Sequence, residues 1–141
     1  MGQDTEGRKR QGMRVLRYLN IWLMLGWAQV CLIILLSLIP SPVELPGLIG
    51  MDKLIHLFAY AFVMLWFGLC YTPCGAYNRL GIGLVLMGIL LELIQGITGY
   101  RSMSYLDMTA DFLGVASGWL LAKTRFSAAL VYIEDKLMPA G

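Results

Sequence analysis

Polar residues that could perform chemistry occur at few places in this very apolar chain, and they gather in three stretches. The first stretch begins with an acid, a base, an imidazole and a phenol; the second ends with an acid and an amide; the third begins with two acids. They are Asp52, Lys53, His56, Tyr60, Glu92, Gln95, Asp107 and Asp111. An imidazole near carboxylates can transfer protons close to neutral pH, and an ammonium group can bind an anion. These residue types therefore predict an acid–base or ligand-binding site.

The spacing of these residues predicts that each group shares one face of a helix. Asp52, His56 and Tyr60 are four residues apart, and Glu92 and Gln95 are three apart. Residues three or four positions apart lie on the same face of an α-helix. Each group can therefore point toward a neighbouring helix.

The two aspartates of the third stretch belong to a longer stripe. Asp107, Asp111, Gly114 and Gly118 recur at helical spacing. The glycines form a small-x-x-x-small pattern, which allows another helix to approach closely. Packing is the simpler role for the glycines, and the stripe predicts that the aspartates face the other helices.

Composition indicates that the elements carrying these groups are membrane helices. Hydrophobic residues make up 58% of the chain and charged residues 14%, whereas a soluble domain has about 45–50% and about 25%. A span needs about 20 apolar helical residues. Four segments meet this requirement, at residues 20–39, 53–71, 79–98 and 107–124. The chain is therefore predicted to be all-α, a four-helix transmembrane bundle.

The predicted spans divide the chain into three parts. A basic cytoplasmic segment covers residues 1–19, the membrane domain covers 20–124, and a cytoplasmic tail covers 125–141. In the tail, Phe126, Leu130, Ile133 and Leu137 recur at helical spacing, with Glu134 and its charged neighbours elsewhere. This pattern predicts a short amphipathic helix on the inner leaflet; a frayed helical tail is the alternative.

The basic residues predict the orientation. With four crossings, nine basic residues fall on the side of both termini and only two, Lys53 and Arg101, on the other. The nine are Arg8, Lys9, Arg10, Arg14, Arg17, Arg79, Lys123, Arg125 and Lys136. Because cytoplasmic loops carry the excess of Lys and Arg, both termini are predicted to be cytoplasmic and the polar residues to face outward. The net charge of +2 is too small to indicate nucleic-acid binding.

The depth of Glu92 in its segment makes this residue a functional candidate. Glu92 lies about 9 Å from the outer end of its segment, where a charge costs up to ~3 kcal/mol. It must be paired, protonated or hydrated. The candidate catalytic residues are His56, Glu92, Asp107 and Asp111, and the candidate ligand-binding residues are Asp52, Lys53, Tyr60, Gln95 and Arg101. Asp52 could instead be a helix cap and Lys53 a headgroup anchor.

Metal binding is conceivable for the same residues. Imidazole and carboxylates suit zinc or manganese. The spacing of His56 and the three acids matches no established metal motif, so the sequence predicts no metal site and identifies no cofactor.

The combined motifs resemble the VanZ-like family. The matching pattern is Asp52-Lys53-x-x-His56-x-x-x-Tyr60, Gly88-x-x-x-Glu92-x-x-Gln95, Arg101, and Asp107-x-x-x-Asp111-x-x-Gly114-x-x-x-Gly118. It covers residues 50–122, about half of the chain. The resemblance implies a small four-helix bacterial membrane protein linked to resistance against the glycopeptide teicoplanin. The family usually has Asn where this chain has Asp111.

Three functions follow as hypotheses for a multi-pass protein of the bacterial cytoplasmic membrane. The first is a site, catalytic or not, that binds or modifies an anionic envelope lipid or a lipid-linked precursor. The second is a non-catalytic accessory subunit whose buried polar network stabilises or regulates an envelope-assembly protein. The third is a small carrier, which the absence of internal repeats disfavours.

Overall fold

The described part of the chain, in a computed structural model, is helical. It comprises residues 16–39, 51–71, 75–98, 103–124 and 128–137. Five helices occur in these ranges: α2 (Leu19–Leu38), α3 (Met51–Cys70), α4 (Gly75–Thr98), α5 (Tyr105–Leu121) and α6 (Ala129–Leu137). The predicted all-α class is confirmed.

Three of the helices are long and apolar enough to cross a membrane. They are α2, α3 and α4, which have 20, 20 and 24 residues. Each coincides with a predicted span to within a few residues. The fourth predicted span forms α5, which has 17 residues and rises about 26 Å, short of the ~30 Å hydrocarbon core.

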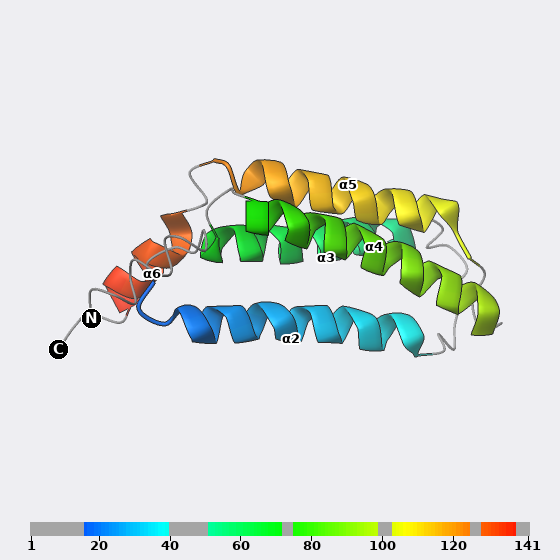
Figure 1. The fold of residues 1–141 in the computed structure, drawn as a ribbon, viewed down its shortest axis with the longest axis horizontal. Helices are drawn as coiled ribbons and strands as arrows, with labels where there is room; N and C mark the ends of the chain where they lie inside the picture. Colours follow the sequence, from blue (N-terminus) through cyan, green and yellow to red (C-terminus); the bar gives the residue numbers. More distant parts are fainter. Residues whose placement is uncertain (1–15, 40–50, 72–74, 99–102, 125–127, 138–141) are drawn as a thin grey trace.

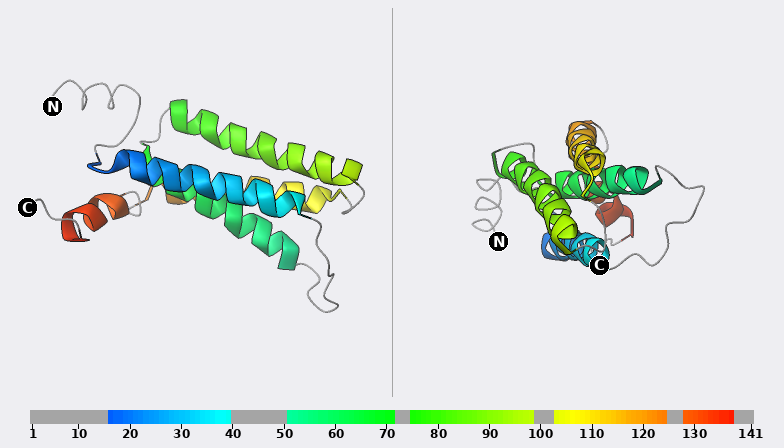
Figure 2. Two further views of the ribbon diagram at one scale, coloured as in Figure 1. Left: turned by 90° about the horizontal axis from the view of Figure 1, so that it is seen from below. Right: turned by 90° about the vertical axis from the view of Figure 1, so that its right-hand side faces the viewer.

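The helices α2 to α5 lie alongside one another and alternate in direction. In Figure 1, α2 and α5 lie at opposite sides of the molecule, and α3 and α4 lie between them. The views of Figure 2 agree, with α3 and α4 on opposite flanks. The start of α3, the end of α4 and the start of α5 therefore reach the same end of the molecule, whereas α6 lies at the opposite end.

Close contact between α3 and α5 depends on the two glycines of the predicted stripe. A Cβ atom on Gly114 would collide with the carbonyl oxygen of Leu57, and one on Gly118 with that of Ala61. Both collisions are with backbone, which cannot move aside cheaply. The prediction that these glycines allow a close helix approach is confirmed, and it fixes the position of the aspartates on α5 relative to α3.

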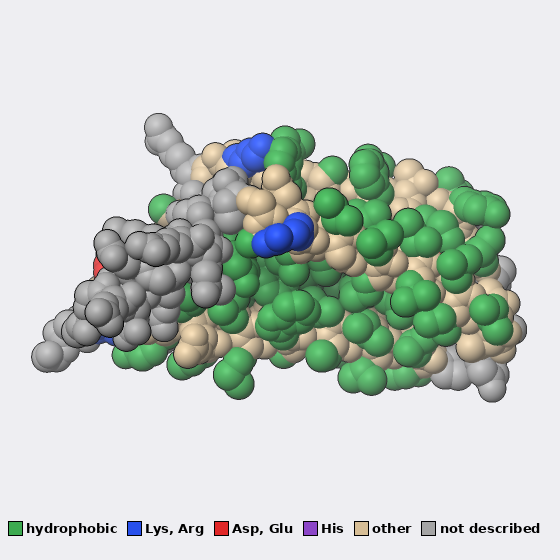
Figure 3. All heavy atoms as spheres, viewed as in Figure 1, with side chains coloured by type: hydrophobic (Ala, Val, Ile, Leu, Met, Phe, Trp, Pro, Cys, Tyr) green, Lys and Arg blue, Asp and Glu red, His purple; other side chains and the backbone are tan. Residues whose placement is uncertain are grey.

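The core lies between the helices, and their outer faces stay apolar. Tyr60, Met64 and Phe67 of α3 are buried with residues from α2, α4 and α5. Large hydrophobic side chains such as Leu35, Phe58 and many others remain exposed. Figure 3 shows hydrophobic side chains over most of one face, with the visible Lys and Arg side chains toward the α6 end. Such an apolar exterior fits lipid as the solvent.

Helix α6 packs against protein and buries a carboxylate. Leu130 is 1% exposed, and Ile133 packs beside it against Leu16 and Leu19. Glu134, predicted to lie off the packed face, is only 7% exposed. That prediction was wrong because backbone and indole N–H groups at and just before the start of α2 donate hydrogen bonds to this carboxylate. Phe126 and the side chain of Leu137 lie outside the described set.

Candidate functional site

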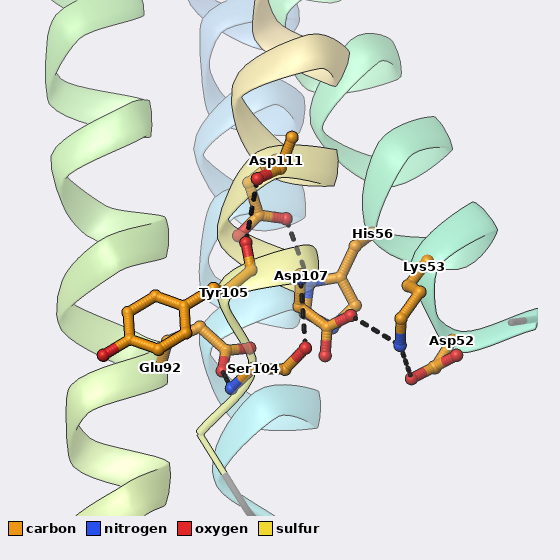
Figure 4. A network of polar contacts seen from close by, with 9 residues as sticks. Asp52, Lys53, His56, Glu92, Ser104, Tyr105, Asp107 and Asp111 are labelled. Carbon is orange, nitrogen blue, oxygen red and sulfur yellow. Dashed lines mark hydrogen bonds and ion pairs between the residues drawn. The ribbon is translucent and has the colours of Figure 1, made fainter.

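Three helices bring the predicted polar residues together at one end of the molecule. Figure 4 shows side chains from the start of α3, the end of α4 and the start of α5 pointing toward one another. Glu92, Asp107 and Asp111 are each 1–2% exposed. The predicted convergence of acids and imidazole from separate helices is therefore present, while the roles of the residues stay predictions.

His56 of α3 contacts Asp111 of α5. The imidazole Nδ1 lies 2.9 Å from Asp111 Oδ1, and the two side chains are 14% and 3% exposed. An ionised carboxylate only accepts hydrogen bonds, so it selects the tautomer in which Nδ1 carries the proton. The second ring nitrogen, Nε2, is then the basic atom of His56.

Lys53 connects the exposed and buried acids of the site. Its Nζ lies 2.8 Å from Asp52 Oδ2 and 3.2 Å from Asp107 Oδ1. Lys53 and Asp52 are partly exposed, whereas Asp107 is buried. This ammonium group therefore stands between the outside and the buried carboxylates.

The carboxylate of Glu92 on α4 accepts a hydrogen bond from the N-cap residue of α5. The backbone N–H of Ser104 donates to Glu92 Oε2 at 2.9 Å. Ser104 is the N-cap of α5, and its Oγ accepts from the N–H of Asp107 at 3.2 Å. The amino terminus of a helix favours a nearby anion, so this position stabilises the Glu92 carboxylate.

Ser104 is a residue that the sequence analysis missed. Its N-cap role positions Glu92 and Asp107 relative to each other. The signal that could have found it is the spacing Ser104-x-x-Asp107 before an apolar run, which is typical of a helix amino terminus.

Gly88 and Tyr60 border the inner side of the site. A Cβ atom on Gly88 would lie 2.6 Å from Asp111 Oδ2 and 3.1 Å from the Tyr60 hydroxyl. The absence of a side chain at Gly88 thus leaves the space that the Asp111 carboxylate occupies. Tyr60 is 2% exposed and belongs to the hydrophobic core, so its ring separates the polar site from the apolar interior.

Gln95 and Arg101 differ from the other candidates. Gln95 Nε2 donates to the carbonyl oxygen of Ser37 at 2.7 Å, so the structure connects it with the end of α2. Its Oε1 is buried and accepts no hydrogen bond from the described residues. Arg101 lies outside the described ranges. Ligand binding by either residue stays a prediction.

Charge balance is the main electrostatic property of the site. One atom each from His56, Glu92 and Asp107 can be chosen so that all lie within 4.8 Å of one another. Asp111 adds a third buried carboxylate beside the imidazole. Against these acids the described residues supply one ammonium group, that of Lys53. Ionised together, the carboxylates give the site a net negative charge in a poorly hydrated place.

Comparison with known proteins found no matching family model, no matching curated protein and no matching solved structure.

Proposed function

We propose that this chain is a VanZ-like, four-pass protein of the bacterial cytoplasmic membrane. Three helices of sufficient length and apolarity support a membrane location. For α5 the support is its packing alongside α3, because its buried face carries the site and its other face exposes Phe112 and Leu120 to the surroundings. The three turn residues after Leu121 extend its reach toward the span predicted from sequence.

The proposed orientation places both termini in the cytoplasm and the polar site outside. Support comes from the ends at which the described basic residues lie. Arg17 lies just before α2 and Lys123 just after α5. Arg79 lies in the first part of α4, Lys136 in α6, and Lys53 at the start of α3. The helices alternate in direction, so four of these basic residues share one end. The positive-inside tendency assigns that end to the cytoplasm.

The proposed activity is binding or modification of an envelope lipid or lipid-linked headgroup. The observation that carries it is the meeting of His56 with Glu92, Asp107 and Asp111 from two other helices. Ionisable groups buried between membrane helices are costly and usually serve function. His56 would transfer or hold a proton, and the acids would orient it and bind headgroup hydroxyl groups. Lys53, at the exposed rim, would contact a headgroup anion.

The resemblance to VanZ-like proteins supplies the phenotype for the test. The chain would be expressed in a teicoplanin-susceptible bacterial strain, and resistance would be measured together with the amount of protein in the membrane. We expect the wild type to raise the inhibitory concentration of teicoplanin. His56→Ala and Glu92→Gln should each abolish that increase while the protein accumulates normally, because both changes remove chemistry from the site.

The exposed residue Asp135 of α6 provides the matched control. Asp135→Asn removes a carboxylate far from the site and should keep full resistance. Loss of both resistance and membrane protein in the site variants would favour the structural network of an accessory subunit. Normal accumulation with full resistance in both site variants would contradict the proposal.

A further inference from the structure

We propose that His56, Glu92 and Asp107 bind one divalent cation of the zinc or manganese class. In a role that rests on the proposed headgroup function, the ion would supply the positive charge that a phosphate or carboxylate headgroup needs in this site. The two proposals share residues but make separate claims, since the ion can bind whether or not a headgroup does.

The first support is the convergence of three donor atoms from three helices. Suitable atoms of His56, Glu92 and Asp107 lie within 4.8 Å of one another. Zinc ligands at about 2.0–2.2 Å from the metal lie about 3.4 Å apart in a tetrahedral arrangement. Small side-chain rotations would therefore close the set around an ion. Three protein ligands with a further open position is the arrangement of catalytic zinc sites.

The second support is the contact between Asp111 and His56. A histidine that binds a metal through one ring nitrogen commonly donates its other N–H to a carboxylate, which fixes the tautomer and raises the basicity of the ligating nitrogen. The 2.9 Å contact between His56 Nδ1 and Asp111 Oδ1 has this form. Asp111 is then a positioning residue, and Nε2 of His56 is the ligand.

The third support is the burial of the Asp107 carboxylate and the position of its counter-charge. Oδ1 of Asp107 is buried, and among the residues that the structure describes its contact is an ion pair and not a well-formed hydrogen bond. The nearest cation recorded for it is Lys53 Nζ at 3.2 Å, and Lys53 also contacts the more exposed Asp52. Lys53 can shift toward Asp52 when an ion takes its place beside Asp107. A buried carboxylate needs such a counter-charge.

Charge also decides which ligand the site prefers. Among the described residues, three buried carboxylates lie near one ammonium group, and when these carboxylates are ionised they repel an anionic headgroup that comes close to them. A bound divalent cation reverses that local balance and leaves a coordination position for a headgroup oxygen. The buried acids and His56 would thus bind a cation first, and the cation together with Lys53 would then attract the headgroup anion.

The test measures cation binding to the purified full-length protein in detergent micelles. Mn²⁺ is titrated and followed by electron paramagnetic resonance, and Zn²⁺ is then added as a competitor. We expect one saturable site per chain. His56→Ala, Glu92→Gln and Asp107→Asn should each weaken binding at least about tenfold, the lower bound seen when even the supporting residues of a metal site are changed. Asp135→Asn should bind as the wild type does.

Thermal unfolding of each variant shows whether it is folded, and any one of the three folded site variants suffices for the comparison. Absence of saturable binding of both ions by the wild type would overturn the inference, as would wild-type affinity in a folded site variant. If the wild type binds neither ion but the site variants lose teicoplanin resistance, the metal site is contradicted and the headgroup function is still supported. If the wild type binds the ion but confers no resistance, the metal site is supported and the proposed function is contradicted.

Discussion

Two regions of this molecule bury carboxylates, and they do so in opposite ways. At the α6 end, Glu134 accepts from the backbone N–H groups of Arg17 and Tyr18 at 2.7 and 3.0 Å and from the Trp22 indole at 2.7 Å. At the other end, Glu92, Asp107 and Asp111 lie around the imidazole of His56, and the Lys53 ammonium group pairs with Asp107. Three N–H donors surround the one acid Glu134, whereas acids predominate among the described residues of the polar site.

The comparison teaches that burial alone does not mark function. Three N–H groups at the start of α2 need acceptors, and Glu134 provides them from a helix more than a hundred residues away in sequence. That carboxylate completes a structure, much as a cap does. The recorded contacts of the acids in the polar site are of another kind: Asp111 contacts an imidazole, Asp107 an ammonium group and Glu92 one backbone N–H. Imidazole and ammonium groups can also exchange protons or bind a ligand, which is the role proposed for this end.

The largest expected effect is on stability and belongs to Glu134. Glu134→Ala leaves three N–H groups without their acceptor and should lower the free energy of unfolding by about 2–4 kcal/mol, since each buried unsatisfied donor costs about 1–3 kcal/mol and some regain water. Thermal unfolding in detergent measures the change. Asp135→Ala, at an exposed neighbouring position, should change little. Equal stability of both variants would mean that the hydrogen bonds of Glu134 do not stabilise the packing of α6 against the start of α2.

The next effect concerns the glycine that sets the distance between α3 and α5. Gly114→Ala places a Cβ atom against the carbonyl oxygen of Leu57, and such overpacking should cost about 1–3 kcal/mol. It should also move Asp111 away from His56 and reduce resistance. Gly83→Ala is the matched control, because a Cβ atom there meets nothing within 4 Å. It should keep wild-type stability or gain up to about 1 kcal/mol from helix propensity.

Acid should weaken the Glu134 contact in a predictable direction. Burial alone would raise the pKa of Glu134, but hydrogen bonds from the N–H groups of Tyr18, Trp22 and Arg17 outweigh it and hold the pKa below its ordinary value of 4.5. A carboxylate with a lowered pKa in the folded state contributes its full stability above the unfolded pKa and loses it as the pH falls through the folded pKa.

Comparison of the wild type with Glu134→Gln across pH isolates this contribution. The difference in melting temperature should be constant from about pH 7 to about pH 6 and shrink below about pH 4.5. Other acids titrate in both proteins and cancel in the difference. A difference that grows on acidification would contradict the direction of the pKa shift.

The smallest expected change in stability belongs to Asp111→Asn in the polar site. The corresponding amide substitution at the other end, Glu134→Gln, provides the contrast. Asp111→Asn keeps the shape of the side chain and removes one of several crowded carboxylates, so stability should change by less than about 1 kcal/mol, or rise slightly. Glu134→Gln keeps one acceptor oxygen but replaces the other with an NH2 group, which cannot accept from the facing N–H groups, and should destabilise the protein. Melting temperatures of both variants test the pair. Similar losses at both ends would erase the distinction between a structural and a functional carboxylate.

Much of the fold and of the polar site could be predicted because both depend on local spacing. The lengths of the apolar segments gave α2, α3 and α4, and helical periodicity placed His56 and the acids on inward faces. The meeting of these faces followed from the alternating direction of the helices. The stripe of Gly114 and Gly118 predicted the close contact of α3 with α5 for the same reason.

The features that could not be predicted from the sequence depend on contacts between residues that are distant in the chain. No local pattern indicates that Glu134 binds the start of α2, since its charged neighbours Asp135 and Lys136 suggest a solvated face. The direction of Gln95 toward Ser37 depends on how α4 packs against α2. Metal-ligand spacing within one segment is likewise uninformative when each donor comes from a different helix.

The most direct test of the central claim, that carboxylates from α4 and α5 meet the imidazole of α3, uses the single histidine of the chain. Nuclear magnetic resonance of protein labelled with ¹⁵N-histidine reports both ring nitrogens of His56 alone. We predict that Asp111→Asn, Asp107→Asn and Glu92→Gln each shift these resonances, whereas Glu134→Gln leaves them unchanged. Resonances that respond to none of the first three substitutions would contradict the convergence on which the account depends.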